Sequence, residues 1–539
     1  MRVYTGQPRT LRDILEASRQ FGDRDYLVYG DDRLTFADHY RLVAGLARCL
    51  RQEYGLVGGD RVAITMRNYP EWGPLFWAIQ AAGLIAVPLN AWWTGPELRY
   101  AVADSGATLV FADAERVAIL QPHLAELAAP VVEVRGGSQP PDGVRSWRDL
   151  VDSLGPDAEL PEVTVAPEDD ATILYTSGTT GRPKGAIGSH RNHCTNMHNT
   201  LLGATVSAIV ANGGVAPDPP GPDEPQPGVL LTFPMFHIAG ITMLCFAALT
   251  GTKMVTMYRW DADEARRLIA REQLASAAGV PTLMRQLVEA ATEHPDDLTT
   301  LAGLSMGGAP IPPELVSRVD TTFASAVAPS NGYGLTETTS AVVSNTGSDY
   351  VTHPDSVGRC QPGADLRIVD PGTGADTAEG EIGELWFRGP NVVRGYWNNP
   401  DATAAAFTDG WFHTGDLGHV RNGWVYVVDR RKDVVIRGGE NVYCVEVEGA
   451  LFEHPDVADA AVVGLPHAAL GEEVAAVLRL HDGATTGAED LREHVATRLA
   501  SFKVPSHVVF WHEPLPRTTT GKVLKRDLRD QIASTVAAG

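Results

Sequence analysis

The chain has 539 residues and a formal net charge of −23, with 44% hydrophobic and 21% charged residues. This length exceeds what one hydrophobic core usually supports, so we expect at least two domains in a globular protein of ordinary composition. The acidic excess argues against binding to nucleic acid or to an anionic membrane, because both partners attract basic surfaces.

The five cysteines are scattered and show no CxxC spacing, which argues against a metal cluster or a disulfide framework and fits a reducing compartment. Residues 1–12 are polar and mixed and lack the pattern of a signal peptide. The most apolar stretch, 238–249, is shorter than the ~20 residues that a bilayer crossing requires. The sequence therefore predicts a cytoplasmic protein without stable membrane insertion.

Segments with helical and strand-like patterns alternate in the first part of the chain. Residues 35–50 have the pattern of an amphipathic helix and 72–82 are helical, whereas short apolar runs at 62–65, 85–88 and 109–112 indicate strands. Such alternation is typical of βαβ units, so we predict an α/β fold with a largely parallel sheet.

Residues 171–174 form an apolar, strand-like run that leads into the glycine- and hydroxyl-rich segment 175–185. Glycines let a backbone approach a ligand closely, hydroxyl groups can donate hydrogen bonds to phosphate oxygens, and Lys184 adds a cation. A Walker A loop is excluded, because Pro183 stands where that motif requires glycine. An ordinary surface turn is the alternative. The candidate phosphate ligands are Thr176, Ser177, Gly178, Thr179, Thr180, Gly181 and Lys184.

The stretch 213–228 is rich in Pro, Gly and Asp and lacks apolar periodicity, so we predict a long exposed loop. A passive surface insertion is the simpler interpretation, and a lid over a pocket is the alternative. His237 follows within the apolar segment 234–240. A histidine in such a run is more often a core residue than a catalytic one, so the residues alone leave its role open.

Two further glycine-rich segments come later in the chain. Gly308, Ala309 and Pro310 follow the strand-like run 301–306 and leave room for a flat ring at a strand end, where α/β sheets bind ligands. The same residues also make an ordinary turn. In the segment 331–338, Tyr333 lies between glycines, where its ring can stack on a base.

Glu337, in that second segment, is a hard oxygen ligand of the kind that suits Mg²⁺. A glycine-flanked turn with a capping threonine is the structural alternative for the whole segment. Its candidate binding residues are Asn331, Gly332, Tyr333, Gly334, Thr336 and Glu337.

Asp416 precedes a predicted hairpin over 418–428, and its carboxylate could accept hydrogen bonds from both hydroxyls of a ribose. Five charged residues follow at 429–433, and beyond them a run of short strands and a helix has about the size of a second domain. We therefore predict a large domain over 1–429, a hinge at 430–433 and a small domain over 434–539. A simple solvated linker is the alternative to a hinge.

The predicted small domain contains two turn segments of interest. The paired glycines in 437–442 allow a β-turn to approach another group closely. Lys522 lies in the Thr- and Gly-rich segment 516–523 near the C-terminus. Most exposed lysines are only solvated charges, so this position alone does not indicate a function.

Together and in this order, the segments resemble the motifs of the adenylate-forming superfamily, which comprises acyl-CoA synthetases, luciferases and peptide-synthetase adenylation domains. The resemblance covers nearly the whole chain and points to an acyl-CoA synthetase. It implies a large N-terminal domain of parallel-rich sheets with helices and a smaller, mobile α+β C-terminal domain. It also implies ATP, Mg²⁺ and coenzyme A, with a small-molecule carboxylic acid as the substrate.

The resemblance further implies roles for single residues. His237 would orient the acyl carboxylate or help to exclude water, and Glu337 would hold the metal ion. Lys522 would bridge the carboxylate and the α-phosphate as charge builds in the transition state. Thr179 completes the implied catalytic set. The implied nucleotide and coenzyme contacts beyond the phosphate loop are Gly308, Ala309, Pro310, Asn331, Gly332, Tyr333, Gly334, Thr336, Asp416, Val428, Arg430, Lys432, Gly438, Gly439, Glu440, Asn441 and Lys522.

In that set Tyr333 and Gly308 would hold the adenine, and Asp416 with Arg430 the ribose. The resemblance places the pivot of domain rotation at Lys432 and the segment 438–441 beside the pantetheine path during thioester formation. Cys444 departs from the proline common at this point of the family, which leaves the catalytic assignments unchanged.

The expected activity is ATP-dependent conversion of a carboxylic acid to its CoA thioester through an acyl-adenylate. The pocket candidates near Met243, 305–308 and 341–343 are small or apolar, so we expect a fatty or arylalkanoic acid. Three alternatives stay open: loading of a carrier protein's phosphopantetheine in trans, a luciferase-like oxidative reaction, and a non-catalytic nucleotide-binding relative. The sequence also leaves a homodimer open.

Overall fold

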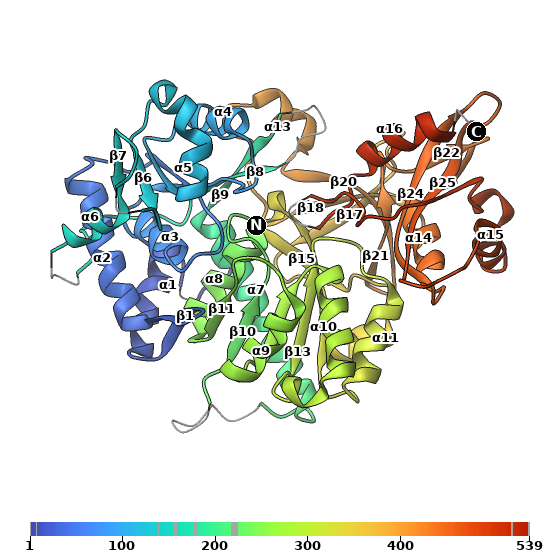
Figure 1. Ribbon diagram of the computed structural model, residues 1–539, viewed down its shortest axis with the longest axis horizontal. Coiled ribbons are helices and arrows are strands. Elements are labelled where there is room, and N and C mark those ends of the chain that lie inside the picture. The colour runs from blue at the N-terminus through green and yellow to red at the C-terminus, as the bar shows by residue number, and fades with distance from the viewer. Residues whose placement is uncertain are drawn as a thin grey trace.

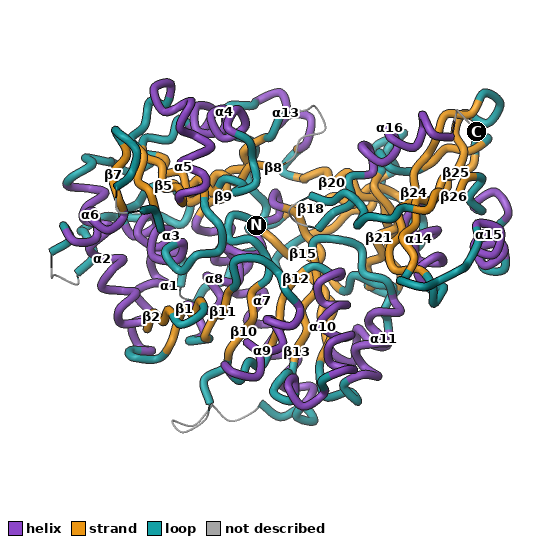
Figure 2. Tube along the Cα trace, in the orientation of Figure 1, coloured by secondary structure: helices purple, strands orange, loops and turns teal. Residues whose placement is uncertain are grey.

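The computed structural model describes residues 2–6, 8–137, 139–155, 159–176, 182–216, 225–518 and 521–536. Within these ranges the strands form four sheets with helices packed around them (Figures 1 and 2). The fourth sheet, near the C-terminus, belongs to a smaller lobe at the right of Figure 1. None of the helices in the described ranges is both long and apolar enough to cross a bilayer.

A seven-stranded sheet forms the upper left part of the large lobe in Figure 1 and is parallel except at one edge. At that edge β8 and β9 pair antiparallel, so the glycine-rich segment predicted to bind phosphate connects the two strands of a hairpin. Across the sheet the strands are β7 (Val144–Ser146), β6 (Val131–Val134), β5 (Leu109–Asp113), β3 (Arg61–Thr65), β4 (Ile85–Pro88), β8 (Asp170–Thr176) and β9 (Lys184–Ser189).

A nine-stranded sheet lies below it, parallel in the centre and antiparallel at both ends. From β10 the chain order runs outward in two directions, to β11 on one side and to β12 on the other. Across the sheet the strands are β16 (Arg359–Cys360), β15 (Ser340–Thr346), β14 (Ala328–Leu335), β13 (Gly303–Gly307), β12 (Ser276–Gly279), β10 (Gly228–Leu231), β11 (Lys253–Thr256), β1 (Asp25–Tyr29) and β2 (Asp32–Thr35).

A layer of helices joins these two sheets into one core. Residues of α1, α3 and α8 share a buried cluster with Ile64 of the seven-stranded sheet and Leu231 of the nine-stranded sheet. Every residue of α3 is buried, because this helix is apolar on all sides and is covered on all sides. The core therefore fixes the relative positions of both sheets, and with them the edges that carry the candidate site.

Two smaller sheets follow, and both are mainly antiparallel. The third contains β17 (Asp365–Val369), β18 (Gly383–Arg388), β20 (Trp411–Arg421) and β19 (Phe407–Thr408), with β21 (Trp424–Arg430) paired to β20. The fourth contains β23 (Glu440–Val442), β22 (Val435–Arg437), β25 (Gly471–Leu480) and β24 (Val457–His467), with β26 (His507–Phe510) paired to β25.

The fourth sheet has hydrophobic clusters of its own on both faces. One face packs on α14 and α15, and the other packs on α16. These clusters contain residues only from the chain after 430, as an independent core requires.

The α-helices in the described ranges are α1 (Leu11–Ser18), α2 (Phe36–Gln52), α3 (Trp72–Ala81), α4 (Gly95–Ser105), α5 (Ala114–Leu120), α6 (Trp147–Asp152), α7 (His190–Ala211), α8 (Ile238–Thr250), α9 (Ala262–Glu272), α10 (Pro281–Glu293), α11 (Pro313–Thr322), α12 (Gly347–Thr352), α13 (Pro400–Ala406), α14 (Cys444–Phe452), α15 (Ala488–Ala496) and α16 (Lys525–Val536).

Most predicted elements are confirmed to within a few residues. Thr35 caps α2 by accepting a hydrogen bond from the backbone of Asp38, and the predicted strand 85–88 coincides with β4. The predicted loop 213–228 begins two residues after α7 and ends where β10 begins, although its residues 217–224 lie outside the described ranges.

One element was predicted wrongly. The predicted hairpin over 418–428 starts earlier, because Asp416 lies inside the long strand β20 and not before it. From Phe412 to Gly418 every second residue of β20 is buried, which is the period of a strand. The buried polar side chains Thr414 and Asp416 obscured this alternation in the sequence.

Candidate active site

The candidate site lies at the carboxyl ends of the central parallel strands. Ligands of open α/β sheets bind in the crevice where the strand order reverses, which here is the edge beyond β10. The chain leaves β10 at Leu231 and reaches His237, which caps the N-terminus of α8. The topology therefore places His237 at the position where a ligand is expected.

His237 is held as a neutral ring. Its Nδ1 accepts a hydrogen bond of 3.2 Å from the backbone N–H of Ala239. Burial, with a smaller contribution from the positive charge of Lys522, lowers the pKa of His237 to about 4. The neutral ring consequently carries its proton on Nε2, which is free to donate a hydrogen bond to a carboxylate or phosphate oxygen.

The phosphate-loop prediction is only partly described by the structure. Thr176 and Lys184 are paired across the β8–β9 hairpin, so both ends of the loop are fixed by the sheet. The Lys184 ammonium lies 5.4 Å from the centre of the Tyr396 ring. The other predicted ligands lie outside the described residues, namely Ser177, Gly178, Thr179, Thr180 and Gly181.

The predicted adenine segments meet at the ends of neighbouring strands. Gly307 of β13 pairs with Gly332 of β14, and Gly308, Ala309 and Pro310 continue from β13 as a partly exposed loop. A Cβ at position 334 would lie 1.9 Å from the carbonyl oxygen of Ser340, so the close approach of β15 requires glycine there. Asn331 is buried within β14, and Thr336 begins the short 3₁₀ turn that follows it.

Tyr333, Asp416 and Arg430 form a connected group. The Tyr333 hydroxyl donates a 2.7 Å hydrogen bond to Oδ2 of Asp416, and Nε of Arg430 lies 2.9 Å from Oδ1 of the same carboxylate. Asp416 and Arg430 face each other across the β20–β21 ladder. The structure thus brings together three residues that the resemblance assigns to the nucleoside, although 83 residues separate Tyr333 from Asp416.

Glu337 is the predicted metal ligand, and it is buried next to this group. The described residues contain no group of three or more His, Cys, Asp or Glu side chains that could hold a metal ion by themselves. One carboxylate at a nucleotide site nevertheless suits Mg²⁺, which commonly takes one or two protein carboxylates together with water and substrate phosphates. The donor set fits that ion.

Tyr396 is a site residue that sequence reasoning missed. Its hydroxyl donates a 2.8 Å hydrogen bond to Oε1 of Glu337, and its ring lies below the Lys184 ammonium. No local motif marks this tyrosine, because its partners come from β9 and from the turn after β14. Its role emerges only when the strands are placed in space.

Lys522 reaches the site from the C-terminal lobe. Lys522 is exposed as a residue, but the protein around its ammonium partly desolvates this group. This desolvation and then the positive charge of Arg430 lower its pKa to about 8, against the opposing effects of Asp416 and Glu337. The next residue toward the N-terminus, Gly521, lies against the large lobe: a Cβ there would be 3.0 Å from Cγ2 of Val280.

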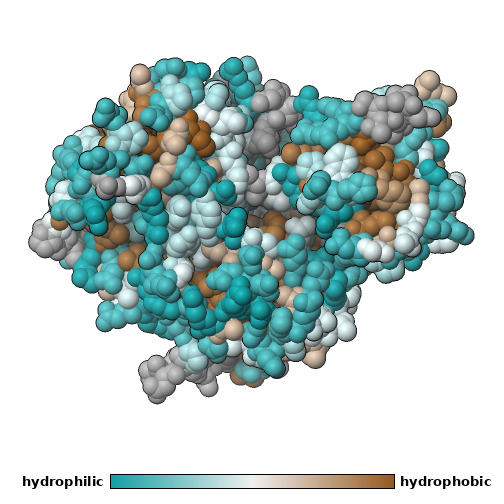
Figure 3. Space-filling model, in the orientation of Figure 1, coloured by the Kyte–Doolittle hydropathy of each residue, from teal (hydrophilic) through white to brown (hydrophobic). Residues whose placement is uncertain are grey.

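The recess between the lobes is visible at the centre of Figure 3. Among the described residues, the charges that converge on it are those of Lys522, Arg430, Asp416 and Glu337. Lys432 is exposed beside them and also contributes to the lowered pKa of Lys522. The predicted catalytic residues Lys522, His237 and Glu337 therefore share one site, and Thr179 lies outside the described residues.

Other predicted contacts lie elsewhere. Gly438 and Gly439 form the two-residue turn between β22 and β23, and both have positive φ angles of 61° and 90°. This turn is exposed, as are Glu440 and Asn441, at the outer edge of the C-terminal lobe (Figure 1). Val428 is half-buried in β21. In this arrangement Lys522 faces the recess, whereas the paired glycines do not line it.

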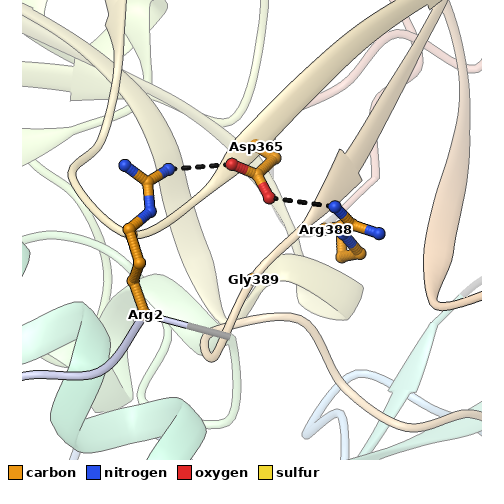
Figure 4. A pocket seen from close by; sticks show the side chains of 5 residues that line it. Arg2, Asp365, Arg388 and Gly389 are labelled. Carbon is orange, nitrogen blue, oxygen red and sulfur yellow. Dashed lines mark hydrogen bonds and ion pairs between the residues drawn. The ribbon is translucent and has the colours of Figure 1, made fainter.

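A surface pocket at the N-terminus offers no competing site. This pocket of ≈ 350 Å³ is lined by Arg2, Gly363, Asp365, Arg388 and Gly389 (Figure 4). Arg2 lies 2.8 Å and Arg388 3.3 Å from the two oxygens of Asp365, so the carboxylate is already neutralised from both sides. The one carboxylate of this lining, Asp365, is thus engaged by two arginines, and the other residues offer neither a nucleophile nor a general base.

Comparisons with known proteins show the family of the chain. The family model "AMP-binding enzyme" matches residues 14–397, and "AMP-binding enzyme C-terminal domain" matches residues 446–522. The chain is 35% identical over 503 residues to a feruloyl-CoA synthase of Amycolatopsis sp, covering 93% of this chain and 94% of that protein.

Two further comparisons span nearly the whole chain. The chain is 33% identical over 517 residues to the long-chain-fatty-acid–CoA ligase FadD13 of Mycobacterium tuberculosis, covering 94% of each protein. The crystal structure of ATP-bound MatB from Rhodopseudomonas palustris matches with a TM-score of 0.82 and 30% identity, covering 97% of this chain and 99% of that chain. The chain therefore belongs to the AMP-binding enzyme family, the adenylate-forming acyl- and aryl-CoA ligases.

Proposed function

We propose that the protein activates a fatty or arylalkanoic monocarboxylic acid with ATP and transfers the acyl group to coenzyme A. The observation that carries the proposal is the convergence of Lys522, His237 and Glu337 on the recess that also contains Asp416 and Arg430. An acid–thiol ligase needs cations for phosphate, a site for the nucleoside and a donor for the acyl carboxylate, and these residues supply all three.

In the first half-reaction, a carboxylate oxygen of the acid attacks the α-phosphorus of ATP, and pyrophosphate leaves. Lys522 stabilises the charge that develops between the carboxylate and the α-phosphate, and Nε2–H of His237 donates to an oxygen of the same region. Asp416 and Arg430 fix the ribose, and Lys184 contacts the leaving phosphates. Mg²⁺ held by Glu337 would supply charge neutralisation for the phosphate oxygens.

In the second half-reaction, the thiolate of coenzyme A attacks the acyl carbon and AMP leaves. We propose that the small domain, residues 434–539, turns about 430–433 between the two halves. Lys522 would withdraw and the Gly438–Gly439 turn would approach the site, with Lys432 as the pivot. The exposed position of this turn supports the proposal, because a rotation is required before these glycines can meet a substrate.

The acyl specificity is inferred from the composition of the predicted pocket segments and from the relatives. Val342 and Val343 on β15 are apolar, and so are most residues of α8, the helix that contains Met243. His237 is neutral, so it offers no positive charge for a second carboxylate. The two curated relatives named above differ in their acids, one aromatic and one aliphatic, which is why both classes must be tested.

The decisive measurement is pyrophosphate release with Mg·ATP across a panel of aliphatic and aromatic acids, each with and without coenzyme A. We expect turnover that requires coenzyme A and yields a thioester with one class of acid. Release without thioester would move the proposal to another acceptor, such as a carrier-protein phosphopantetheine. Absence of release with every acid, in a protein that binds ATP, would contradict the ligase function.

A further inference from the structure

Tyr396 occupies the space between two opposite charges of the site. It belongs to the segment between β18 and α13, which lies against β9 through an antiparallel bridge from Tyr396 to Ala186. The backbone N–H of Trp397 also donates a 2.7 Å hydrogen bond to the carbonyl of Gly185. The backbone of this tyrosine is therefore anchored beside the phosphate loop independently of its side chain.

The side chain of Tyr396 contacts both charged groups in different ways. The hydroxyl donates to Oε1 of Glu337 at 2.8 Å, and the ring presents its face to the Lys184 ammonium at 5.4 Å from the centroid. An ammonium over an aromatic face and a carboxylate at a phenolic hydroxyl are both favourable contacts. The hydroxyl is the donor in this contact, because a carboxylate oxygen accepts the hydrogen bond.

We propose that Tyr396 is a positioning residue for the metal ion: it fixes Glu337 through one oxygen and keeps this carboxylate apart from Lys184. Because the hydroxyl binds Oε1, we assign the metal ion to the second oxygen, Oε2. In a direct Lys184–Glu337 ion pair, the ammonium that binds phosphate and the carboxylate that binds the metal ion would both be engaged with each other and not with the ligand. The tyrosine thus holds the two groups in reach of Mg·ATP and prevents them from neutralising each other.

The inference rests on the proposed function, because it assumes that Glu337 holds the metal of Mg·ATP. Its test uses the full-length protein, Mn²⁺ as the probe and α,β-methylene-ATP, whose α–β bridge is not cleaved. Mn²⁺ binding is measured by electron paramagnetic resonance. Loss of a residue that orients a metal ligand typically weakens metal binding 10- to 100-fold, so we expect Tyr396→Phe to weaken Mn²⁺ binding about tenfold.

A second variant separates the two contacts. Tyr396→Phe keeps the ring under Lys184, whereas Tyr396→Leu removes both ring and hydroxyl. We expect only Tyr396→Leu also to weaken binding of the metal-free nucleotide, because Lys184 is then free to pair with Glu337. In steady-state assays the Mg²⁺ concentration for half-maximal pyrophosphate release should rise about tenfold in Tyr396→Phe, with the rate at saturating Mg²⁺ nearly retained.

The matched control is Tyr40→Phe, which also deletes a tyrosine hydroxyl that donates to a carboxylate, Oε2 of Glu16 at 3.0 Å, but does so outside the site. It should leave Mn²⁺ binding unchanged. Equal Mn²⁺ binding by the wild type and Tyr396→Phe would overturn the inference. If Tyr396→Phe weakens Mn²⁺ binding tenfold but the wild-type protein is inactive with every acid, the metal-positioning role of Tyr396 is supported. Only the proposed ligase function is then contradicted.

Discussion

At the scale of single residues, the protonation of Lys522 controls the proposed chemistry. This ammonium lies between the attraction of Asp416 and Glu337 and the repulsion of Arg430 and Lys432. With its pKa lowered to about 8, the lysine loses its proton within an accessible pH range, unlike an ordinary lysine with a pKa of about 10.4.

We therefore expect ATP–pyrophosphate exchange to decline as the pH rises through about 8, because only the charged lysine can stabilise the transition state. Arginine keeps its charge in this range, so the residual activity of Lys522→Arg should lack this decline. The measurement is a pH profile of exchange beside a profile of thioester formation from synthetic acyl-adenylate. An identical alkaline decline in both half-reactions would contradict the role of Lys522.

His237 is the second titratable residue of the site, and it acts in its neutral form, whereas Lys522 acts in its charged form. Because its pKa is lowered to about 4, the ring is neutral throughout the range in which Lys522 titrates. An acidic limb near pH 6.5 should be absent from the exchange profile, since that is where an unperturbed histidine titrates. Such a limb, if found and removed in His237→Asn, would show that the ring is charged in the working enzyme.

Sequence motifs predicted the residues that act through their own chemistry, but not those that act through neighbours. Lys522 and Glu337 could be assigned because each lies in a distinctive segment that resembles a family motif. Tyr396 could not, because its function depends on contacts with Glu337, which lies 59 residues away in the chain, and with Lys184, which is more distant still. Such contacts are a property of strand order and not of local sequence.

At the scale of elements, α16 is attached to the C-terminal lobe through a buried ion pair. Lys525, at its first position, lies 2.7 Å from Oε1 of Glu448, and both side chains are mostly buried. The same Oε1 accepts a 2.8 Å hydrogen bond from the backbone of Val462. Asp429 is close enough for the lysine charge to act on it, and its carboxylate accepts a hydrogen bond from the backbone N–H of Cys444 at the start of α14.

Lys525→Met should destabilise this lobe by about 3 kcal/mol, because it leaves buried carboxylates without their cation. The pKa of Lys525 is higher in the folded protein than in the unfolded chain. Its charge therefore stabilises the lobe fully at every pH below the pKa of the unfolded lysine, which includes pH 7.5. Burial raises the pKa of Asp429 to about 6, so this carboxylate takes up a proton at pH 5 and the loss should shrink there.

Calorimetric unfolding of the full chain at pH 7.5 and pH 5 measures this difference. The control is Arg529→Met on the same helix, since the pair of Arg529 with Asp530 is exposed and contributes little. An equal effect of both variants, or a loss for Lys525→Met that does not shrink at pH 5, would contradict the buried-pair explanation.

Most helices and strands were easier to predict from the sequence than β20, the strand that carries Asp416. Apolar periodicity identified α2, β4 and β5 because their buried faces are made of hydrophobic residues. β20 escaped the same reasoning, since its buried positions include Thr414 and Asp416, whose partners Leu385 and Arg430 lie on neighbouring strands. A polar group can replace an apolar one at a buried position when it is paired, and the pairing is not visible in the sequence.

At the scale of the whole molecule, the turn that carries Lys522 forms one of the contacts between the two lobes. The turn is closed by hydrogen bonds from the Thr518 backbone N–H to the carbonyl of Lys522 and from the Gly521 N–H to the carbonyl of Thr518. Gly521 has a φ angle of 80°, and its Cα faces Val280, which immediately precedes α10 of the large lobe. In the position in which Lys522 reaches the recess, this turn therefore lies on Val280.

Gly521→Ala should impair adenylation selectively. The added Cβ would lie 3.0 Å from Cγ2 and 3.2 Å from Cβ of Val280, and the left-handed backbone is unfavourable for alanine. A displacement of a reacting group by about 1 Å can cost on the order of 100-fold in rate, so ATP–pyrophosphate exchange should fall strongly. Thioester formation from synthetic acyl-adenylate should persist, because we propose that it uses the rotated lobe.

The double variant Gly521→Ala with Val280→Ala tests which of two causes operates. If the collision between the lobes displaces Lys522, truncating Val280 removes the colliding methyl groups and exchange should recover toward the value of Val280→Ala alone. If backbone strain within the turn is responsible, the second substitution restores nothing, because the φ angle is unchanged. Equal loss of both half-reactions in Gly521→Ala would contradict the proposed rotation, since one lobe position would then serve both steps.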